Sequence, residues 1–214
     1  MLSLKKQRQK RGMGYMKKRP KYLILLFMFI AIVFVLFLLN FNKNEANDPV
    51  VNGNIIQFKN FDLDAKSTNL KTMTEGTIFV EGEKEHIDHI KIVAHVEIDP
   101  ADWGGVAFYI PDQWSVSSIT SSYPEHQSKL KPAEYVSTWR NSSDDSSWRT
   151  MIEIGRERNY IANGGGTGTI VIELSPVQKG MSPSESLKIG IEVGSEEKNG
   201  NRIMGTDSVK VPVF

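Results

Sequence analysis

Hydrophobic residues follow two distinct patterns along this chain, and each pattern predicts a different environment. Near the N-terminus they form one unbroken tract, residues 22–41, without a charged residue, a glycine or a proline. From residue 55 onward they alternate with polar residues in short stretches. The first pattern is typical of a helix in lipid, and the second is typical of β-strands with one buried face.

The tract at residues 22–41 has the length of a membrane-spanning helix. At about 1.5 Å per residue, a helix of this tract spans about 30 Å, the thickness of the hydrocarbon core of a bilayer. A buried helix of a water-soluble protein would carry polar residues every three or four positions, whereas Asn40 is the one strongly polar residue here. We therefore expect a transmembrane helix that anchors the chain in the bilayer.

Charge on either side of the tract predicts its orientation. Nine basic residues and no acidic residue precede it, whereas Lys43 after it is accompanied by Glu45 and Asp48. By the positive-inside rule, the basic tail of residues 1–21 is cytoplasmic and the C-terminal part lies outside the membrane. The residues that we expect to set this topology are next to the helix: Lys17, Lys18, Arg19 and Lys21.

A cleaved signal peptide is the alternative to an uncleaved signal anchor. Such a peptide has a shorter apolar region and ends in small residues around the cleavage site. Residues 40–46 read NFNKNEA and lack this pattern, and a chain without Cys cannot carry a lipoprotein anchor. We expect a signal anchor whether translation starts at Met1, Met13 or Met16, because each start retains the basic residues next to the helix.

The part beyond the membrane tract divides into a linker and one domain. Residues 42–50 are polar and include a proline, which is typical of a linker. A linker of this length reaches about 30 Å at most, so the folded part stays close to the membrane surface. Residues 51–214 have the length of one domain, and no internal repeat divides them.

Alternation with a period of two dominates the domain and predicts an all-β fold. Ten stretches have strand character, and turn sequences such as Asn199-Gly200 separate them. Short antiparallel strands of this number predict two sheets packed face to face, as in an immunoglobulin-like or jelly-roll sandwich. Pro212 lacks an N–H, so we expect the last strand at a sheet edge. The stretches are residues 55–58, 77–81, 90–98, 106–110, 115–121, 135–140, 149–155, 168–174, 187–193 and 209–213.

Candidate catalytic and metal-binding motifs are weak. His89 and His95 would lie about 20 Å apart on one strand, too far apart to share a metal ion. The glycine run at residues 164–168 precedes a strand and not a helix, so it predicts a turn and not a phosphate-binding loop. The chain has no G-x-S-x-G motif. We therefore expect no catalytic residue, no metal site and no cofactor.

The aromatic residues form the most informative cluster. All four Trp residues lie between positions 103 and 148, whereas the flanking halves of the domain are aliphatic. Two hypotheses stay open: the rings fill the sandwich core, or some of them lie on a surface where they stack on sugars or anchor a protein. The candidate ligand-binding residues stand where loops meet strands: Trp103, Trp114 and Trp148.

Charge excludes one class of partner. The chain has 26 basic and 25 acidic residues, and the nine basic residues of the tail leave 17 basic and 25 acidic residues, a net charge of −8, in the remainder. A body of this charge repels phosphate, so we expect no nucleic-acid binding.

The expected function is that of a non-catalytic, membrane-anchored, extracytoplasmic interaction domain. Its partner would be another envelope or membrane protein, which it contacts as a subunit, adaptor or sensor ectodomain. The alternative is a module that binds an envelope glycan through exposed Trp side chains. An extracytoplasmic hydrolase is the third hypothesis.

Overall fold

A computed structural model shows the domain, and contacts group residues 52–214 into one compact unit. The predicted tail, membrane helix and linker lie outside the described residues, and so do the four basic residues next to the helix. In the described part of the chain, no helix has both the length and the apolar character needed to cross a membrane. The described residues are 55–83, 86–125, 132–143, 146–178 and 187–213.

Ten β-strands supply nearly all the regular structure of the described residues, together with one short 3-10 helix, η1 (Pro132–Tyr135). All neighbouring strands pair antiparallel. The all-β prediction is therefore confirmed. The strands are β1 (Ile55–Asp64), β2 (Met73–Glu83), β3 (His86–Ile98), β4 (Val106–Ile110), β5 (Trp114–Ser121), β6 (Val136–Arg140), β7 (Thr150–Ile154), β8 (Gly166–Pro176), β9 (Lys188–Lys198) and β10 (Asn201–Pro212).

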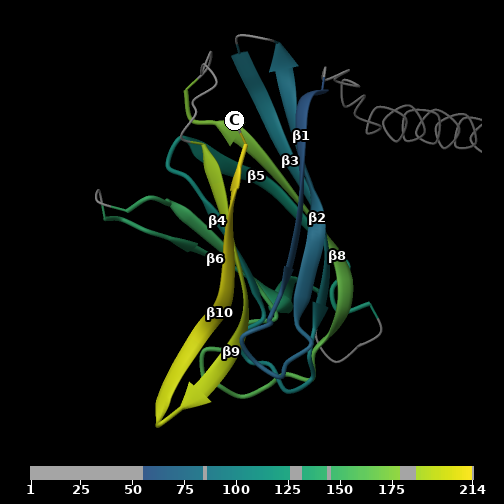
Figure 1. Ribbon diagram of the computed structural model, residues 1–214. Coiled ribbons are helices and arrows are strands. Elements are labelled where there is room, and N and C mark those ends of the chain that lie inside the picture. The colour runs from purple at the N-terminus through teal and green to yellow at the C-terminus, as the bar shows by residue number, and fades with distance from the viewer. Residues whose placement is uncertain (1–54, 84–85, 126–131, 144–145, 179–186, 214) are drawn as a thin grey trace, which may run out of the picture. The chain divides into compact units, whose positions relative to one another are not determined.

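The strands form two five-stranded sheets that face each other (Figure 1). The first sheet has the order β1-β2-β3-β8-β5, and the second has the order β10-β9-β4-β7-β6. This arrangement confirms the predicted two-sheet antiparallel sandwich. It also places β10, which contains Pro212, at an edge of the second sheet, as expected for a residue that cannot donate a ladder hydrogen bond.

Alternate side chains of both sheets fill the space between them. Every second residue of β3 from Ile90 to Ile98 is at most 2% exposed, and the matching positions of β8 and β9 are buried as well. Phe61 from β1 and Phe108 from β4 meet edge to face across this core, with ring centroids 6.2 Å apart. Each fully buried aliphatic side chain stabilises the fold by about 1.5–3 kcal/mol, so the alternation fixes which face of each strand points inward.

The C-terminal hairpin is longer than the sequence pattern predicts. β9 and β10 pair as far as Lys198 and Asn201, and their tip lies at the lower end of the domain in Figure 1. Asn199 and Gly200 form the turn with φ of 53° and 75°, the conformation that suits the twist of a two-residue hairpin. Alternation does not reveal the outer half of the hairpin because both of its strands are largely exposed there.

The glycine run forms a connection between the two sheets, as the sequence predicts. It links β7 of the second sheet to β8 of the first sheet. Gly165 has a φ of 64°, and a Cβ atom there would lie 2.2 Å from the carbonyl oxygen of Ile98. Only glycine fits this close approach, so the glycine run is needed for the path of the backbone from β7 to β8.

Candidate functional site

The outer face of the second sheet differs from an ordinary solvated sheet face because part of it is buried. On β7, Ile152 and Ile154 point into the core, yet the outward-facing Met151 and Glu153 are only 8% and 3% exposed. The register places Tyr109 of β4 between Met151 of β7 and Gly190 of β9. This face therefore combines buried charge, an aromatic ring and a position without a side chain.

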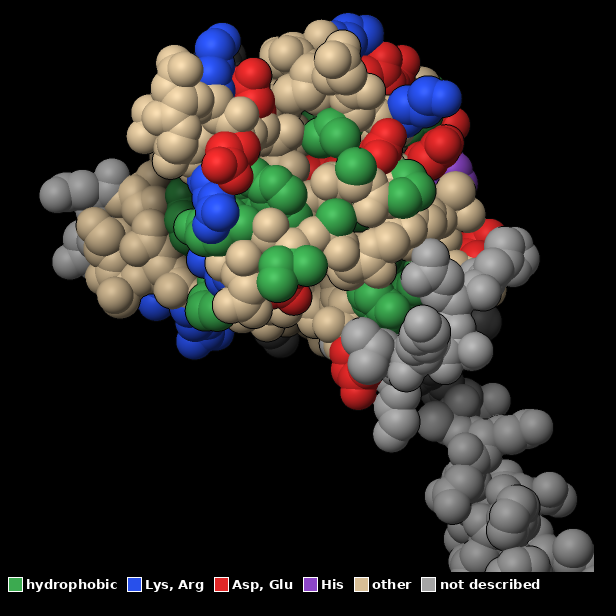
Figure 2. All heavy atoms as spheres, turned by 90° about the horizontal axis from the view of Figure 1, so that it is seen from below, with side chains coloured by type: hydrophobic (Ala, Val, Ile, Leu, Met, Phe, Trp, Pro, Cys, Tyr) green, Lys and Arg blue, Asp and Glu red, His purple; other side chains and the backbone are tan. Residues whose placement is uncertain are grey.

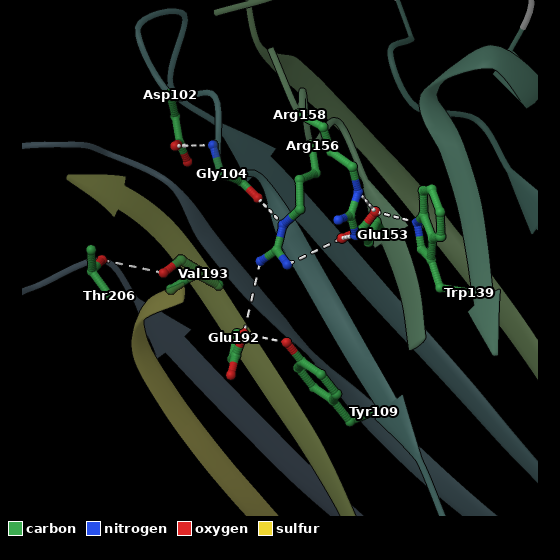
Figure 3. Close-up of polar contacts among 10 residues, drawn as sticks. All are labelled: Asp102, Gly104, Tyr109, Trp139, Glu153, Arg156, Arg158, Glu192, Val193 and Thr206. Carbon is green, nitrogen blue, oxygen red and sulfur yellow. Dashed lines mark hydrogen bonds and ion pairs between the residues drawn. The ribbon is translucent and has the colours of Figure 1, made fainter. Parts of the chain in front are cut away.

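A buried arginine organises the charged part of this face (Figure 3). The Arg156 side chain is 4% exposed, and its Nε donates a hydrogen bond to the carbonyl oxygen of Gly104 at 2.6 Å. Its Nη1 donates to Glu153 Oε1 at 3.3 Å, and its Nη2 lies 3.9 Å from Glu192 Oε2. One guanidinium thus connects the loop before β4 with β7 and β9.

Glu153 accepts further hydrogen bonds from the other side. Arg158 Nη2 donates to its Oε1 at 2.6 Å, and the indole Nε1 of Trp139 donates to its Oε2 at 2.5 Å. The Arg158 guanidinium also lies 4.1 Å from the centre of the Trp139 ring, a cation–π contact. Two acidic and two basic residues therefore neutralise one another in this network, which is made of Glu153, Glu192, Arg156 and Arg158.

Tyr109 connects the network to a groove on the same face of the sheet. Its hydroxyl donates a hydrogen bond to Glu192 Oε2 at 2.5 Å. Burial, the hydrogen bond to Glu192 and the charge of Glu192 raise the pKa of Tyr109 to about 12. Tyr109 therefore stays neutral and donates this bond at any physiological pH.

A groove of about 430 Å³ lies on the β10, β9 and β4 part of this face. Gly190 is one of its lining residues, and the Tyr109 side chain lies against it: a Cβ atom at Gly190 would meet the Tyr109 Cβ at 3.2 Å. The rings of Tyr109 and Trp148 meet edge to face, with centroids 5.3 Å apart, and form an aromatic corner. The lining residues are Tyr109, Pro111, Asp112, Gln113, Ser147, Trp148, Lys188, Gly190, Ile191, Glu192, Ser208, Val209 and Lys210.

The three candidate Trp residues occupy three different environments. Trp148 is partly buried and lines the groove. Trp103 is also partly buried, but its ring packs edge to face on Tyr160, with centroids 5.0 Å apart, and it is not among the groove residues. Trp114 is 1% exposed and belongs to the core, so the exposed position that its place after a loop suggested is wrong.

Sequence reasoning missed the partners of Trp148. Tyr109 and Glu192 stand in strands whose alternation marks their positions as outward-facing, and outward-facing residues of a sheet are usually solvated. One signal was available: β7 carries Glu153 in a stretch that is otherwise hydrophobic or Thr. A carboxylate among such neighbours indicates a buried charge that needs a cationic partner.

Asp102 forms a second buried polar cluster, which ties the turn before β4 to its neighbours. It is 0% exposed and accepts hydrogen bonds from Thr72 Oγ1 at 2.5 Å, from the N–H of Gly104 at 2.7 Å and from Ser195 Oγ. Ser195 is itself 4% exposed. All these groups bind one another inside the protein, so the cluster supports the turn and does not face a ligand.

Within the residues that the structure covers, no group of three His, Asp or Glu side chains is placed to hold a metal ion. His89 and His95 lie on β3, opposite Glu81 and Glu75 of β2. No protein-family model matches the chain, and a comparison with curated proteins finds no match.

Proposed function

We propose that this protein is a non-catalytic binding domain, held at the outer surface of the membrane by its N-terminal helix. The tract at residues 22–41 and the basic residues before it support the anchor and its orientation. We group the domain with sandwiches of the immunoglobulin-like or jelly-roll kind. It would serve as a subunit, adaptor or sensor ectodomain that holds a component of the cell envelope.

The groove beside the Arg156 network is the observation that carries this proposal. Its volume of about 430 Å³ is within the range of about 300–1,000 Å³ that ligand sites occupy. Behind it, the hydrogen bond between Tyr109 and Glu192 and the contact of Glu192 with Arg156 fix the wall. A fixed wall lowers the ordering cost of binding, which favours recognition.

The state of the two buried acidic residues, Glu153 and Asp102, supports binding over hydrolysis. Glu153 is 3% exposed and engaged by Arg156, Arg158 and Trp139, and Asp102 is fully buried. A catalytic carboxyl group must reach the proton of a bound substrate. Neither carboxylate can do so without breaking its present hydrogen bonds.

A second surface favours contact with a protein. At the end of the domain that is lowest in Figure 1, hydrophobic side chains lie among acidic and basic ones (Figure 2). Tyr160 and Ile161 are 42% and 67% exposed, and the Arg202 guanidinium lies 4.9 Å from the centre of the Tyr160 ring. Aromatic and arginine side chains on an exposed apolar patch are typical of protein interfaces.

Site-specific photo-crosslinking in intact cells tests this proposal. The full-length chain would carry benzoylphenylalanine at Gln113 on the groove rim, and a control chain would carry it at the exposed Thr120 of β5, in the other sheet. We expect an adduct from Gln113 that Thr120 does not give. A discrete band indicates a protein, and a smear that glycan hydrolases collapse indicates a glycan. Equal adducts from both positions, or none from Gln113, would contradict the proposal.

A further inference from the structure

The shape of the groove selects a ligand with flat apolar faces and polar edges. Tyr109 and Trp148 stand at 71° to each other, so their rings form two sides of a corner. Gly190 lets the Tyr109 side chain of this corner lie close against β9, since a Cβ at Gly190 would meet the Tyr109 Cβ at 3.2 Å. A pyranose ring has this form, because its C–H groups gather on two faces and its hydroxyl groups point outward. Aromatic rings attract such C–H groups through their negative faces.

The groove also supplies hydrogen-bonding groups that could bind those hydroxyls. Gln113 and Ser147 come from the loops that flank β5 and β7, and Ser208 comes from β10. An amide both donates and accepts hydrogen bonds, and so does a hydroxyl. These groups suit a polyhydroxylated ligand better than an aliphatic one.

The charge of the groove adds a second requirement. Lys188 and Lys210 line it from β9 and β10, and neither forms an ion pair with a residue that the structure describes. Glu192 does not neutralise them, because Tyr109 and Arg156 already hold its Oε2. With Asp112 as the remaining acid, the open part of the groove carries a net positive charge, although the domain as a whole is acidic.

The two ammonium groups come from neighbouring positions on the same face. Lys210 is paired with Gly190 and Lys188 is paired with Pro212, so the two lysines are diagonal neighbours on the hairpin. Both can therefore approach one anionic substituent of a ligand whose ring lies against Tyr109 and Trp148. Such charge-assisted hydrogen bonds are about twice as strong as neutral ones.

We infer that this groove binds an acidic saccharide unit, with the sugar ring against Tyr109 and Trp148 and its carboxylate or phosphate between Lys188 and Lys210. This inference rests on the proposed binding function and names the ligand class for the groove. A peptide strand fits less well. The adjacent sheet edge is β10, where Pro212 offers no N–H and Lys210 carries a charge, and both features disfavour the pairing of a further strand.

Calorimetric titration of the full-length chain tests this inference. A polyoxyethylene detergent is required, because maltoside detergents carry sugar head groups that would compete. The probes are tetragalacturonic acid for a carboxylate, poly(glycerol phosphate) for a phosphate without a pyranose ring, glucose 1-phosphate for a phosphate on a sugar, and maltotetraose as the neutral control. We expect binding of the acidic sugars, weakened by salt, and at least about tenfold weaker binding of maltotetraose.

Substitutions separate the contribution of aromatic stacking to affinity from the contribution of the lysine charges. Trp148→Ala should abolish binding of every sugar probe, whereas the pair K188A/K210A should weaken only the acidic sugars, by at least about tenfold. The matched control is the pair K59A/K198A, which removes the same charge from residues outside the groove and should leave affinity within about twofold, because distant exposed charges are screened.

Each result decides the inference. Equal affinity for acidic and neutral sugars, or equal losses in the two double-lysine variants, would overturn it. Binding of poly(glycerol phosphate) as tight as that of glucose 1-phosphate would also overturn it, since the ring would then contribute nothing. If no probe binds while Gln113 still forms its adduct in cells, the acidic sugar is wrong and the binding function stands. If no probe binds and Gln113 forms no adduct in cells, the proposed binding function is itself wrong.

Discussion

The rings of Tyr109 and Trp148 meet edge to face, with centroids 5.3 Å apart and planes inclined by 71°. Tyr109 belongs to β4, in the middle of the second sheet, whereas Trp148 belongs to the loop before β7. Their contact attaches a loop side chain to a rigid strand. Because Tyr109 is hydrogen-bonded to Glu192, and Glu192 in turn contacts Arg156, the groove is shaped before a ligand arrives.

Removal of the Tyr109 hydroxyl should lower stability in a pH-dependent way. At pH 8, Tyr109→Phe loses the hydrogen bond to Glu192, and we expect a loss of about 1 kcal/mol in the free energy of unfolding. The folded-state pKa of Tyr109 is about 12, above its ordinary value of 10.0. The stability that Tyr109 contributes is therefore complete below pH 10 and is lost as the pH rises toward 12. The gap between wild type and Tyr109→Phe should accordingly narrow above pH 10.

Denaturant titrations at pH 8 and at about pH 11.5 measure this gap. Trp fluorescence reports on the domain alone, because all four Trp residues lie between positions 103 and 148. Lysines and other tyrosines titrate equally in both proteins and cancel in the comparison. A gap that stays constant or widens with pH would show that the hydrogen bond to Glu192 does not depend on a protonated Tyr109.

Substitution of Tyr123 by Phe should not lower the free energy of unfolding, in contrast to Tyr109→Phe. Its ring is 0% exposed, and its hydroxyl has no hydrogen-bond partner among the described residues. Burial raises the pKa of this phenol well above its usual value. Tyr123→Phe removes the buried polar atom and keeps the ring, so the free energy of unfolding at pH 8 should be unchanged or rise by up to about 1 kcal/mol. A loss of more than about 1 kcal/mol would mean that the hydroxyl is hydrogen-bonded in solution.

Glu153 should be among the most sensitive polar positions of the domain. Glu153→Gln keeps the shape of the side chain but removes the nearer carboxylate of the buried Arg156 and leaves only Glu192 at 3.9 Å, and we expect a loss of about 3 kcal/mol. The matched control is Glu197→Gln, which breaks the exposed pair with Arg202 and should cost less than about 1 kcal/mol. Thermal unfolding of the two variants compares them. Similar losses would show that the Arg156 network is not the stabilising element that its burial implies.

Two glycines with similar φ values should differ in their tolerance of a methyl group. Gly200 has a φ of 75° and open space around it, so Gly200→Ala should cost about 1 kcal/mol from the left-handed backbone alone. Gly165 has a φ of 64°, but there the methyl group also meets the carbonyl oxygen of Ile98. Gly165→Ala should therefore cost clearly more than Gly200→Ala in denaturant titrations. Equal costs would mean that the connection between the sheets can move away from β3.

Much of the fold could be predicted from the sequence because one face of each strand is buried. The alternation from Ile90 to Ile98 marks such a strand, and all ten predicted stretches correspond to strands of the structure. Strand ends were less predictable where burial stops. β10 begins at Asn201, well before the alternating residues that follow Ser208, because pairing with β9 continues through an exposed hairpin.

The site was less predictable because it depends on pairing between strands. Sequence position alone put Trp114 and Trp148 in similar settings, since each follows a polar loop. The structure separates them: the Trp114 ring points into the sandwich, and Trp148 lies on Tyr109. Lys210 and Tyr109 come beside Lys188 and Gly190 of β9 only through the register of β4, β9 and β10, which no local pattern encodes.

The chain contains no Cys, so one introduced thiol can test where the groove lies and whether it is occupied. Ser208→Cys places that thiol at an exposed groove position, and Ser3→Cys places one in the basic tail as a control. In intact cells, a membrane-impermeant maleimide should label position 208 but not position 3, and added tetragalacturonic acid should slow the labelling. Labelling of position 208 only after lysis would contradict the outward orientation, and labelling at an unchanged rate with the acidic sugar would contradict the groove as its binding site.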